Sequence, residues 1–275
     1  MDEQTGNSMR VVSYNLREHT ARGEIEALAR DNRADVLCLQ EADTNDIPDT
    51  LGDMVLAAST RNNRLGLAAY YRPDRFELLG SQVYALKKSM HDRVMSPAHE
   101  RLLAMHLADR VSQSDVLVGS FHAAPLTATN GLRRKQVASA HQLMRALAPG
   151  VPMLMVGDFN YPWFHHGLRK QIERDGFILT RSDSPTYLGY RYVKGHFDFA
   201  TSIGLTIDDI VTLPAGVSDH RPILVRAKAS PPPEASPLEG PQAGRGRGGA
   251  PGRIGVDPPE QRGQAASRSA SVVTA

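Results

Sequence analysis

Two polar residues, Asp158 and Asn160, follow directly after a short apolar run at residues 153–156 and a glycine. The apolar run predicts a buried strand, and Gly157 allows the backbone to turn sharply where the strand ends. In that position Asp158 can orient an attacking water and accept its proton, while the Asn160 amide can donate to a charged oxygen. The alternative is an ordinary loop, because Asp and Asn are common turn residues.

Polar side chains also end, or lie inside, several other apolar runs, and this repetition favours a functional interpretation. The runs at residues 11–14, 36–40, 116–121, 196–200 and 223–225 predict further strands. Together with the pair above, the polar residues at these places are Asn15, Glu41, His122, Asp158, Asn160, Asp198, Asp219 and His220. One such placement carries little weight, whereas the whole series predicts strand ends that converge on one cleft.

Hydrolysis of a phosphate ester is the chemistry that fits this set of side chains. Mg²⁺ prefers oxygen ligands, which Glu41 offers with help from Asn15 and Asp219. Such an ion neutralises the charge that develops on a phosphoryl group. Asn160 and His220 can donate to the non-bridging oxygens, which is the electrostatic stabilisation that phosphoryl transfer needs.

Asp198 and His220 form a natural couple within this set. A carboxylate bonded to one imidazole nitrogen fixes the tautomer and favours the protonated ring, which binds an anionic phosphate well. In the alternative interpretation, another donor satisfies Asp198 as a buried acid, and His220 is a surface turn residue.

The elements that must position these residues alternate between strands and helices. Helices are predicted near residues 25–29, from residue 131 with an apolar stripe at Val137, Ala140, Met144 and Leu147, and at 171–174. Strands at 65–71 and 76–86 are expected to form a pair across a turn at residues 72–75, and strands at 102–107 and 116–122 form another pair.

Composition divides the chain into one folded domain with two disordered ends. At 275 residues and 41% hydrophobic the chain can build a large core, which we expect at residues 9–228. Residues 1–8 and 229–275 are expected to be disordered, because the tail is rich in Pro, Gly, Arg and Ser and offers little to bury. Its Gly-Arg stretch can contact nucleic acid, although a solvated tail is the favoured interpretation.

Several classes of protein are excluded or disfavoured. A formal charge of +2 excludes a strong polycation, and Cys38 as the sole cysteine excludes an intrachain disulfide or a cysteine zinc cluster. There is no glycine-rich phosphate loop, dinucleotide fingerprint or serine-hydrolase elbow. With no long apolar span or signal peptide in view, we expect a cytoplasmic protein, assumed to be a monomer.

The motifs, taken in order, resemble the endonuclease/exonuclease/phosphatase superfamily of deoxyribonuclease-I-like enzymes. The matching pieces are Ser13-Tyr14-Asn15, Leu39-Gln40-Glu41, Phe121-His122, Gly157-Asp158-Phe159-Asn160, Phe197-Asp198-Phe199 and Ser218-Asp219-His220-Arg221-Pro222. The resemblance implies a four-layer α/β sandwich, in which two central mixed β-sheets are flanked by helices. It also implies a Mg²⁺- or Mn²⁺-dependent phosphoesterase.

The resemblance also assigns roles to single residues. Asn15 and Glu41 correspond to metal-site residues, and Asp219 to a second metal-linked carboxylate. Asp158 corresponds to the water-activating acid, Asn160 and His122 to phosphate contacts, and Asp198 to the orienting partner of His220. The chain departs from some nuclease members at Arg17, where they carry an acid.

Three functions are compatible with these observations. The favoured one is a phosphodiesterase or nuclease on DNA or RNA, for which the available phosphate-binding cations are Arg61, Arg64, Arg72, Arg101, Arg133, Arg134 and Arg191. The alternative is a sphingomyelinase- or inositol-phosphatase-like enzyme acting on a lipid head group, or an enzyme acting on a small phosphate ester. The third is an inactive binding module, which the intact set of polar residues argues against.

Overall fold

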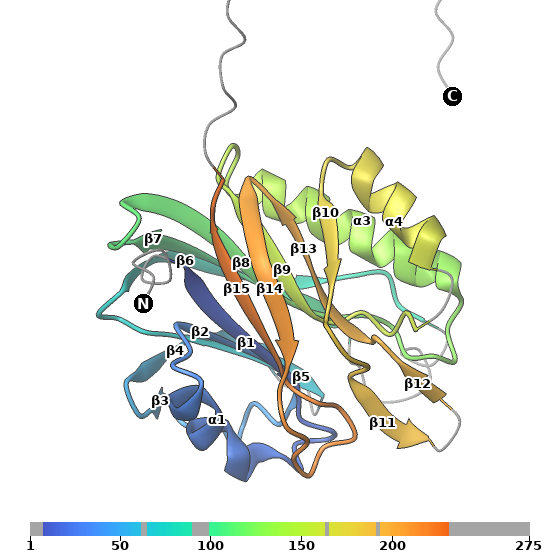
Figure 1. Ribbon diagram of the computed structural model, residues 1–275, viewed down its shortest axis with the longest axis horizontal. Helices are drawn as coiled ribbons and strands as arrows, with labels where there is room; N and C mark the ends of the chain where they lie inside the picture. Colours follow the sequence, from blue (N-terminus) through green and yellow to red (C-terminus); the bar gives the residue numbers. More distant parts are fainter. Residues whose placement is uncertain (1–7, 62–64, 90–98, 163–164, 191–192, 231–275) are drawn as a thin grey trace, which may run out of the picture. The chain divides into compact units, whose positions relative to one another are not determined.

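Two β-sheets face one another in this protein, and helices cover the outer side of each sheet (Figure 1). The computed structural model describes residues 8–61, 65–89, 99–162, 165–190 and 193–230. Figure 1 shows α1 (Ile25–Asp31) on one side of the strands and α3 (Asn130–Leu147) with α4 (His165–Arg174) on the other. This arrangement confirms the predicted four-layer α/β sandwich.

The first sheet has seven strands and is mixed. β1 and β2 run parallel, while the other neighbours are antiparallel. In spatial order the strands are β14 (Leu205–Thr212), β15 (Ile223–Ala229), β1 (Met9–Asn15), β2 (Val36–Ala42), β5 (Gly66–Tyr71), β4 (Met54–Ser59) and β3 (Thr50–Leu51).

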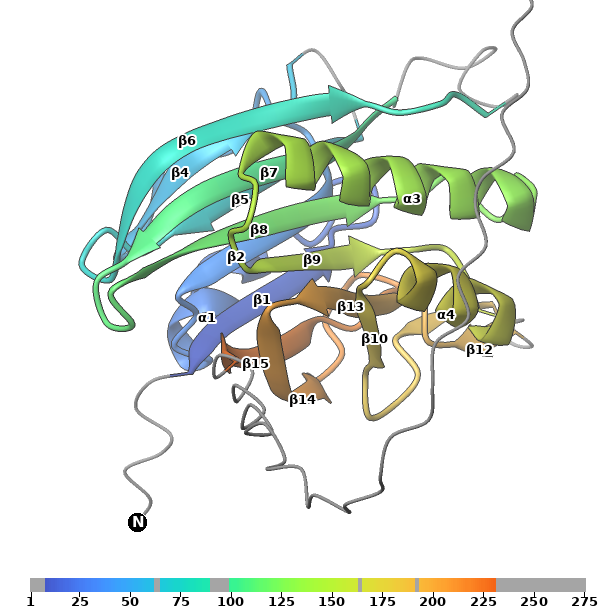
Figure 2. The ribbon, with the colours of Figure 1, turned by 90° about the horizontal axis from the view of Figure 1, so that it is seen from above.

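The second sheet has six strands and contains the parallel pair β8–β9. In spatial order they are β10 (Ile178–Arg181), β13 (Asp198–Ile203), β9 (Met153–Asp158), β8 (Ser114–His122), β7 (Glu100–Asp109) and β6 (Phe76–Ala85). A small ribbon of β11 (Tyr187–Tyr190) and β12 (Val193–Gly195) and a 3-10 turn at Arg22–Glu24 complete the described elements. Figure 2 shows α3 and α4 alongside the strands of this sheet.

Three apolar clusters fill the spaces between the four layers. The central one joins the facing sides of the two sheets, as Val11 and Cys38 of the first sheet and Val118 and Val156 of the second illustrate. A second cluster lies between the second sheet and helices α3 and α4, and a third lies between the first sheet and α1. Because successive side chains of a strand point to opposite faces, the continuous apolar runs of the central strands supply both faces of each sheet, and the apolar stripes of the helices cover the outer faces.

Helix α3 follows the predicted pattern closely. Val137, Ala140 and Met144 are buried against the second sheet, and the Thr129 side chain caps the helix by accepting from Leu132 N. Among the described residues, no helix combines the length and the apolar character that a membrane crossing requires.

Several expectations about elements are wrong in detail. β5 and β6 do not pair, because the turn at residues 72–75 carries the chain from one sheet to the other. The helix predicted at 171–174 begins at His165. The domain boundaries at residues 9 and 228 stay predictions; at their margins, Ser8 is buried and Ala229 is the last residue of β15. Most of both predicted disordered ends, residues 1–7 and 231–275, lies outside the described residues.

A buried cation ties the two sheets together at the β5–β6 turn. Arg75 Nη1 donates to Asp35 Oδ2 at 2.7 Å, just before β2, and its Nη2 donates to Asp109 Oδ2 at 3.0 Å, at the end of β7. Burial alone would raise the pKa of Asp109, but the hydrogen bonds from Arg75 outweigh it and the pKa is lowered. The two acids thus share one cation across the sandwich.

Replacing Arg75 with Met should lower the free energy of unfolding by about 3–5 kcal/mol, because two buried carboxylates lose their partner. Urea denaturation at neutral pH measures the change. Arg30→Met is the matched control, since the Arg30–Asp31 pair is exposed and such pairs contribute about 1 kcal/mol or less. Equal stability of the two variants would contradict the role given to Arg75.

Candidate active site

The ends of four strands bring polar side chains from both sheets to one place. Asn15 and Glu41 lie at the ends of the parallel strands β1 and β2, and His122 and Asp158 lie at the ends of β8 and β9. Asn15 Nδ2 donates to Asp158 Oδ2 at 3.1 Å, and His122 Nε2 lies 3.7 Å from Glu41 Oε1. The two sheets therefore meet through these contacts, as the sequence predicts.

Asp158 is the centre of the cluster. Its Oδ1 accepts from the backbone N–H of Asn160 at 2.8 Å, and its Oδ2 accepts from Asn160 Nδ2 at 3.0 Å. Two imidazole nitrogens, His122 Nε2 at 3.7 Å and His220 Nε2 at 3.8 Å, face the same oxygen. Hydrogen bonds from Asn15 and Asn160 thus fix the orientation of this carboxylate, and two imidazole rings lie beside it.

Burial raises the pKa of Asp158 to about 7. The positive charge of His220 opposes this rise, while the negative charges of Asp198 and Glu41 add to it. A carboxylate that titrates near neutrality is well matched to receiving a proton at physiological pH.

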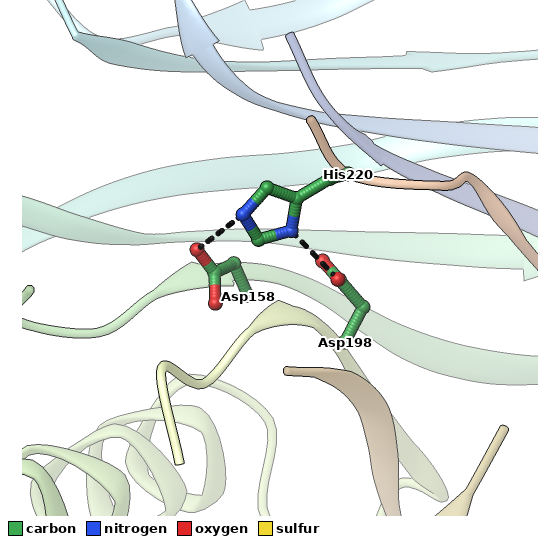
Figure 3. Close-up of side chains that lie close together, drawn as sticks. All are labelled: Asp158, Asp198 and His220. Atoms are coloured by element: carbon green, nitrogen blue, oxygen red, sulfur yellow. Dashed lines mark hydrogen bonds and ion pairs between the residues drawn. The ribbon is translucent and has the colours of Figure 1, made fainter. Parts of the chain in front are cut away.

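His220 lies between two carboxylates (Figure 3). Its Nδ1 is 2.8 Å from Asp198 Oδ2, and both side chains are buried. Burial alone would lower the pKa of His220, but the charges of Asp198 and Asp158 outweigh it and raise the pKa to about 10. The ring is therefore a cation at neutral pH, and both its nitrogens carry protons.

Close backbone packing places Asp158 beside His122, which pairs with it in the parallel register of β8 and β9. Gly157 lies within β9 at φ +145°, and a Cβ there would stand 1.9 Å from the carbonyl oxygen of Phe121. The sequence interpretation of Gly157 as a turn residue is therefore wrong. The glycine is needed because no side chain fits between the two strands.

Strained backbone accompanies two of the site residues. Glu41 has φ +54° and Asn160 has φ +49°, in the left-handed region that non-glycine residues rarely adopt. Asn tolerates this region better than Glu, and such strain persists where surrounding contacts over-determine the conformation. Glu41 lies at an irregularity near the end of β2, and Asn160 follows directly after β9.

Asn15 acts as a donor in this geometry. Its Nδ2 contacts both Glu41 Oε1 at 3.3 Å and Asp158 Oδ2 at 3.1 Å, and its Oδ1 accepts from the Arg17 N–H at 3.0 Å. The amide oxygen is thus turned towards the backbone, and Asn15 holds the two carboxylates in place. Its predicted function as a metal-site residue is compatible with this orienting contact.

The donor set fits a hard divalent cation. Glu41 offers a partly exposed carboxylate close to Asp158, and the mutual repulsion of these acids would be relieved by an added positive charge. Asp158, Asp198 and His220 also place one ligand-type atom each within 4.8 Å of one another. Because His220 is protonated, however, that trio suits proton handling better than metal ligation.

Contacts no longer than 3.8 Å connect all the predicted site residues except one. The exception is Asp219, whose Oδ2 lies 3.9 Å from Arg17 Nε. The roles given to these residues from the sequence stay predictions. Sequence reasoning missed Ser218, whose hydroxyl accepts from His220 N at 3.1 Å and donates to Asn15 O at 2.7 Å.

The expectation of a cluster of phosphate-binding arginines is partly wrong. Arg101 is buried, and its Nη1 donates to the carbonyl oxygens of His122 and Ala123, at 3.1 and 2.8 Å. Arg133 is buried as well, and its Nη1 donates to Pro125 O. Both long side chains therefore support the backbone around the site, while Arg64 and Arg191 lie outside the described residues.

Comparisons with known proteins match most of the described chain. A model of the Endonuclease/Exonuclease/phosphatase family matches residues 12–220. A search of curated protein sequences gives no significant match.

Solved structures of low sequence identity share the fold. The mannosyl-6-phosphatase Bt3783 of Bacteroides thetaiotaomicron has a TM-score of 0.64 at 17% identity, covering 80% of this chain and 99% of its own. D. rerio TDP2 in complex with a single-stranded DNA product has a TM-score of 0.62 at 14% identity, covering 81% and 99%. The human Nocturnin catalytic domain with bound sulfate has a TM-score of 0.59 at 16% identity, covering 81% and 95%. At these identities the likeness concerns the fold alone.

The Asp198→Asn variant should lower the pKa of His220 well below 10, because the imidazolium loses the carboxylate that contacts its Nδ1. A ¹⁵N–¹H NMR titration of the imidazole signals measures this directly. Asp209→Asn, at a half-exposed pair with Arg226 on β15, is the control and should leave the His220 titration in place. An unchanged titration in the Asp198→Asn variant would show that another group protonates the ring.

Proposed function

The chain belongs to the endonuclease/exonuclease/phosphatase family, whose members are hydrolytic phosphoesterases, and we propose that it is a metal-dependent phosphodiesterase that cleaves DNA or RNA. The position of Asp158 carries this proposal. It is a buried carboxylate, held by a donor from the facing sheet, with a pKa near neutrality and a protonated histidine beside it.

In the proposed reaction, Asp158 orients a water molecule and accepts its proton as the oxygen attacks phosphorus. The P–O bond to the leaving alcohol breaks in the same displacement, and the departing oxygen takes up a proton. The His220 imidazolium faces the same point and stabilises the negative charge on the non-bridging oxygens, while Asp198 holds the ring in orientation. A preorganised cation in a buried site stabilises such charge more strongly than a solvated one.

Asn160 and His122 are the proposed further phosphate contacts. One amide N–H of Asn160 has only a long contact, 3.5 Å, to the Ala123 carbonyl, so it is available to a phosphoryl oxygen. His122 Nε2 lies 3.7 Å from both Asp158 Oδ2 and Glu41 Oε1. When bound by Glu41, with Asn15 orienting it and Asp219 as a predicted second carboxylate, Mg²⁺ or Mn²⁺ supplies charge neutralisation at the phosphoryl group.

Charge near the site supports a nucleic acid as the substrate. Residues 116–157 contain no Asp or Glu, so α3 and most of β8 and β9 carry no acid, the exceptions being Asp115 at the start of β8 and Asp158 at the end of β9. Arg134 and Lys135 lie in the second turn of α3, and Arg134 Nη1 donates to Tyr161 Oη at 2.9 Å, next to Asn160. A polyanion bound along α3 would contact the basic side chains of this helix, which carries no carboxylate to repel it.

The apolar rim of the site supports the alternative, a phosphoesterase acting on a lipid head group or a small phosphate ester. Leu188 is 46% exposed and Val217 is 59% exposed, and both flank Asp219. An apolar part of a substrate would cover these side chains.

Asp158→Asn should lower kcat by about 10²-fold or more, because the proton acceptor is lost while the shape of the side chain is kept. Steady-state hydrolysis of bis(p-nitrophenyl) phosphate with Mg²⁺ measures the effect. Asp209→Asn is the control for a distant acid and should retain wild-type turnover. Near-normal activity of Asp158→Asn would remove its proposed role.

A panel of substrates tests the choice of function. The purified protein with Mg²⁺ is assayed on plasmid DNA, RNA, sphingomyelin vesicles and a generic phosphodiester, at low and high salt. We expect cleavage of nucleic acid that falls steeply with salt, because phosphate contacts release counterions. EDTA should abolish the activity and added Mg²⁺ restore it, and Glu41→Gln should require more Mg²⁺. A preference for sphingomyelin would favour the alternative, and activity that persists in EDTA would contradict the metal requirement.

A further inference from the structure

Three consecutive residues after the first site strand have left-handed backbone conformations. Arg17, Glu18 and His19 have φ of +47°, +50° and +69°, although none of them is a glycine or an asparagine. Each such residue costs roughly 1–2 kcal/mol, so a run of three persists only when other contacts stabilise it. The contacts that stabilise this turn involve residues of the site.

Hydrogen bonds show what this turn does to the site. Arg17 N donates to Asn15 Oδ1 at 3.0 Å, and Glu18 N donates to Glu41 Oε2 at 2.9 Å. His19 Nδ1 accepts from Asp43 N at 2.9 Å and anchors the far end of the turn. The two N–H groups are thus aimed at the site, and the turn leaves the Arg17 side chain at the rim.

The Arg17 guanidinium lies beside Asp219 at the rim of the site. Its Nε is 3.9 Å from Asp219 Oδ2, with side-chain exposures of 56% for Arg17 and 23% for Asp219. A long, exposed ion pair of this kind contributes little to stability. The guanidinium therefore keeps donors that can bind another anion.

Asp219 itself is firmly held. Leu188 N donates to its carbonyl oxygen at 2.7 Å, and its neighbour Ser218 is bonded to Asn15 O at 2.7 Å. Its carboxylate is close enough to His220 for its charge to act on that ring. Asp219 thus fixes one end of the ion pair near the proposed phosphate position, while the longer Arg17 side chain can move.

We propose that Arg17 forms a subsite for a second anionic group of the substrate, next to the scissile phosphate, and that Asp219 positions its guanidinium. This inference rests on the proposed function. His220 and Asn160 are nearly buried and belong to the reacting phosphate, whereas Arg17 lies further out. The planar guanidinium matches a phosphate in two-point contact, so the subsite selects substrates with a second phosphate, such as a nucleic acid strand.

Two probes that differ in one phosphate test the subsite. They are thymidine 5′-(p-nitrophenyl phosphate) and the same compound with an added 3′-phosphate. Arg17→Ala should lower kcat/KM for the probe with the 3′-phosphate by about 10- to 100-fold, mainly through KM, because a charge-assisted contact is lost. The loss on the probe without the 3′-phosphate should be at most about threefold. Arg17→Lys should restore part of the difference, because it keeps the charge without the planar fork.

The matched control is Arg22→Ala, since Arg22 is exposed in the adjacent 3-10 turn and pairs with Asp46 at 3.2 Å. It should change neither probe. Equal losses on both probes in Arg17→Ala, or no loss on either, would overturn the subsite. Melting curves verify that each variant folds, and Arg17→Lys serves as the comparison if Arg17→Ala does not.

A binding measurement separates this inference from the proposed function. Calorimetry compares thymidine 3′,5′-bisphosphate with thymidine 5′-monophosphate, and Arg17→Ala should reduce binding of the bisphosphate selectively. If the wild type hydrolyses neither probe but shows this selectivity, the proposed function fails and the subsite stands. In calorimetry without Mg²⁺, Asp219→Asn should weaken binding of the bisphosphate and leave binding of the monophosphate unchanged, because Asp219 acts through Arg17. Equal weakening of both ligands would overturn the positioning role of Asp219.

Discussion

The buried negative charge of Asp158 is the constraint on which the site depends. A carboxylate removed from water is stable only when donors and cations surround it, and here they come from both sheets. Asn15 reaches it from the first sheet, and Asn160 and His122 from the second, while His220 arrives on the loop before β15. The geometry of the site is therefore a direct product of the packing of one sheet against the other.

The charges of the cluster are arranged in alternation. Asp198 and Asp158 lie on either side of the His220 ring, and Glu41 lies beyond Asp158, next to His122. This order keeps the His220 cation next to Asp158, the acid that is proposed to take a proton. It also leaves the negative charge of Glu41 at the partly exposed end of the cluster. An anionic phosphoryl group and a divalent cation would complete the same alternation rather than disturb it.

The sequence predicts the central strands and their site residues well, and it predicts the peripheral strands and turns poorly, for physical reasons. Strands such as β1, β2, β8 and β9 are continuous apolar runs with a polar end, so both their type and their site residues could be read directly. β14 was missed because two adjacent acids, Asp208 and Asp209, interrupt its apolar alternation at the point where its pairing register shifts. The turn at Arg17–His19 gave no signal, since its residue types do not normally adopt positive φ.

Long side chains explain another failure of sequence reasoning. Arg101 and Arg133 were expected to face a substrate because of their charge, yet each folds inward and donates to backbone carbonyl groups. Residue type alone does not indicate whether a long arginine side chain directs its guanidinium towards a substrate or towards the protein interior. For Gly157 the sequence indicated that the residue matters but not why. A glycine is required there because two strands approach closely, and this depends on tertiary structure.

The contact between Gly157 and Phe121 has an evolutionary consequence. Any larger residue at position 157 would push β9 away from β8, so the pairing of these two strands beside the site does not tolerate gradual change. A change of substrate among proteins of this fold must then arise in the surrounding segments, which here carry Arg17, Leu188 and Val217. Relatives that differ in specificity should keep the glycine and exchange these surrounding segments.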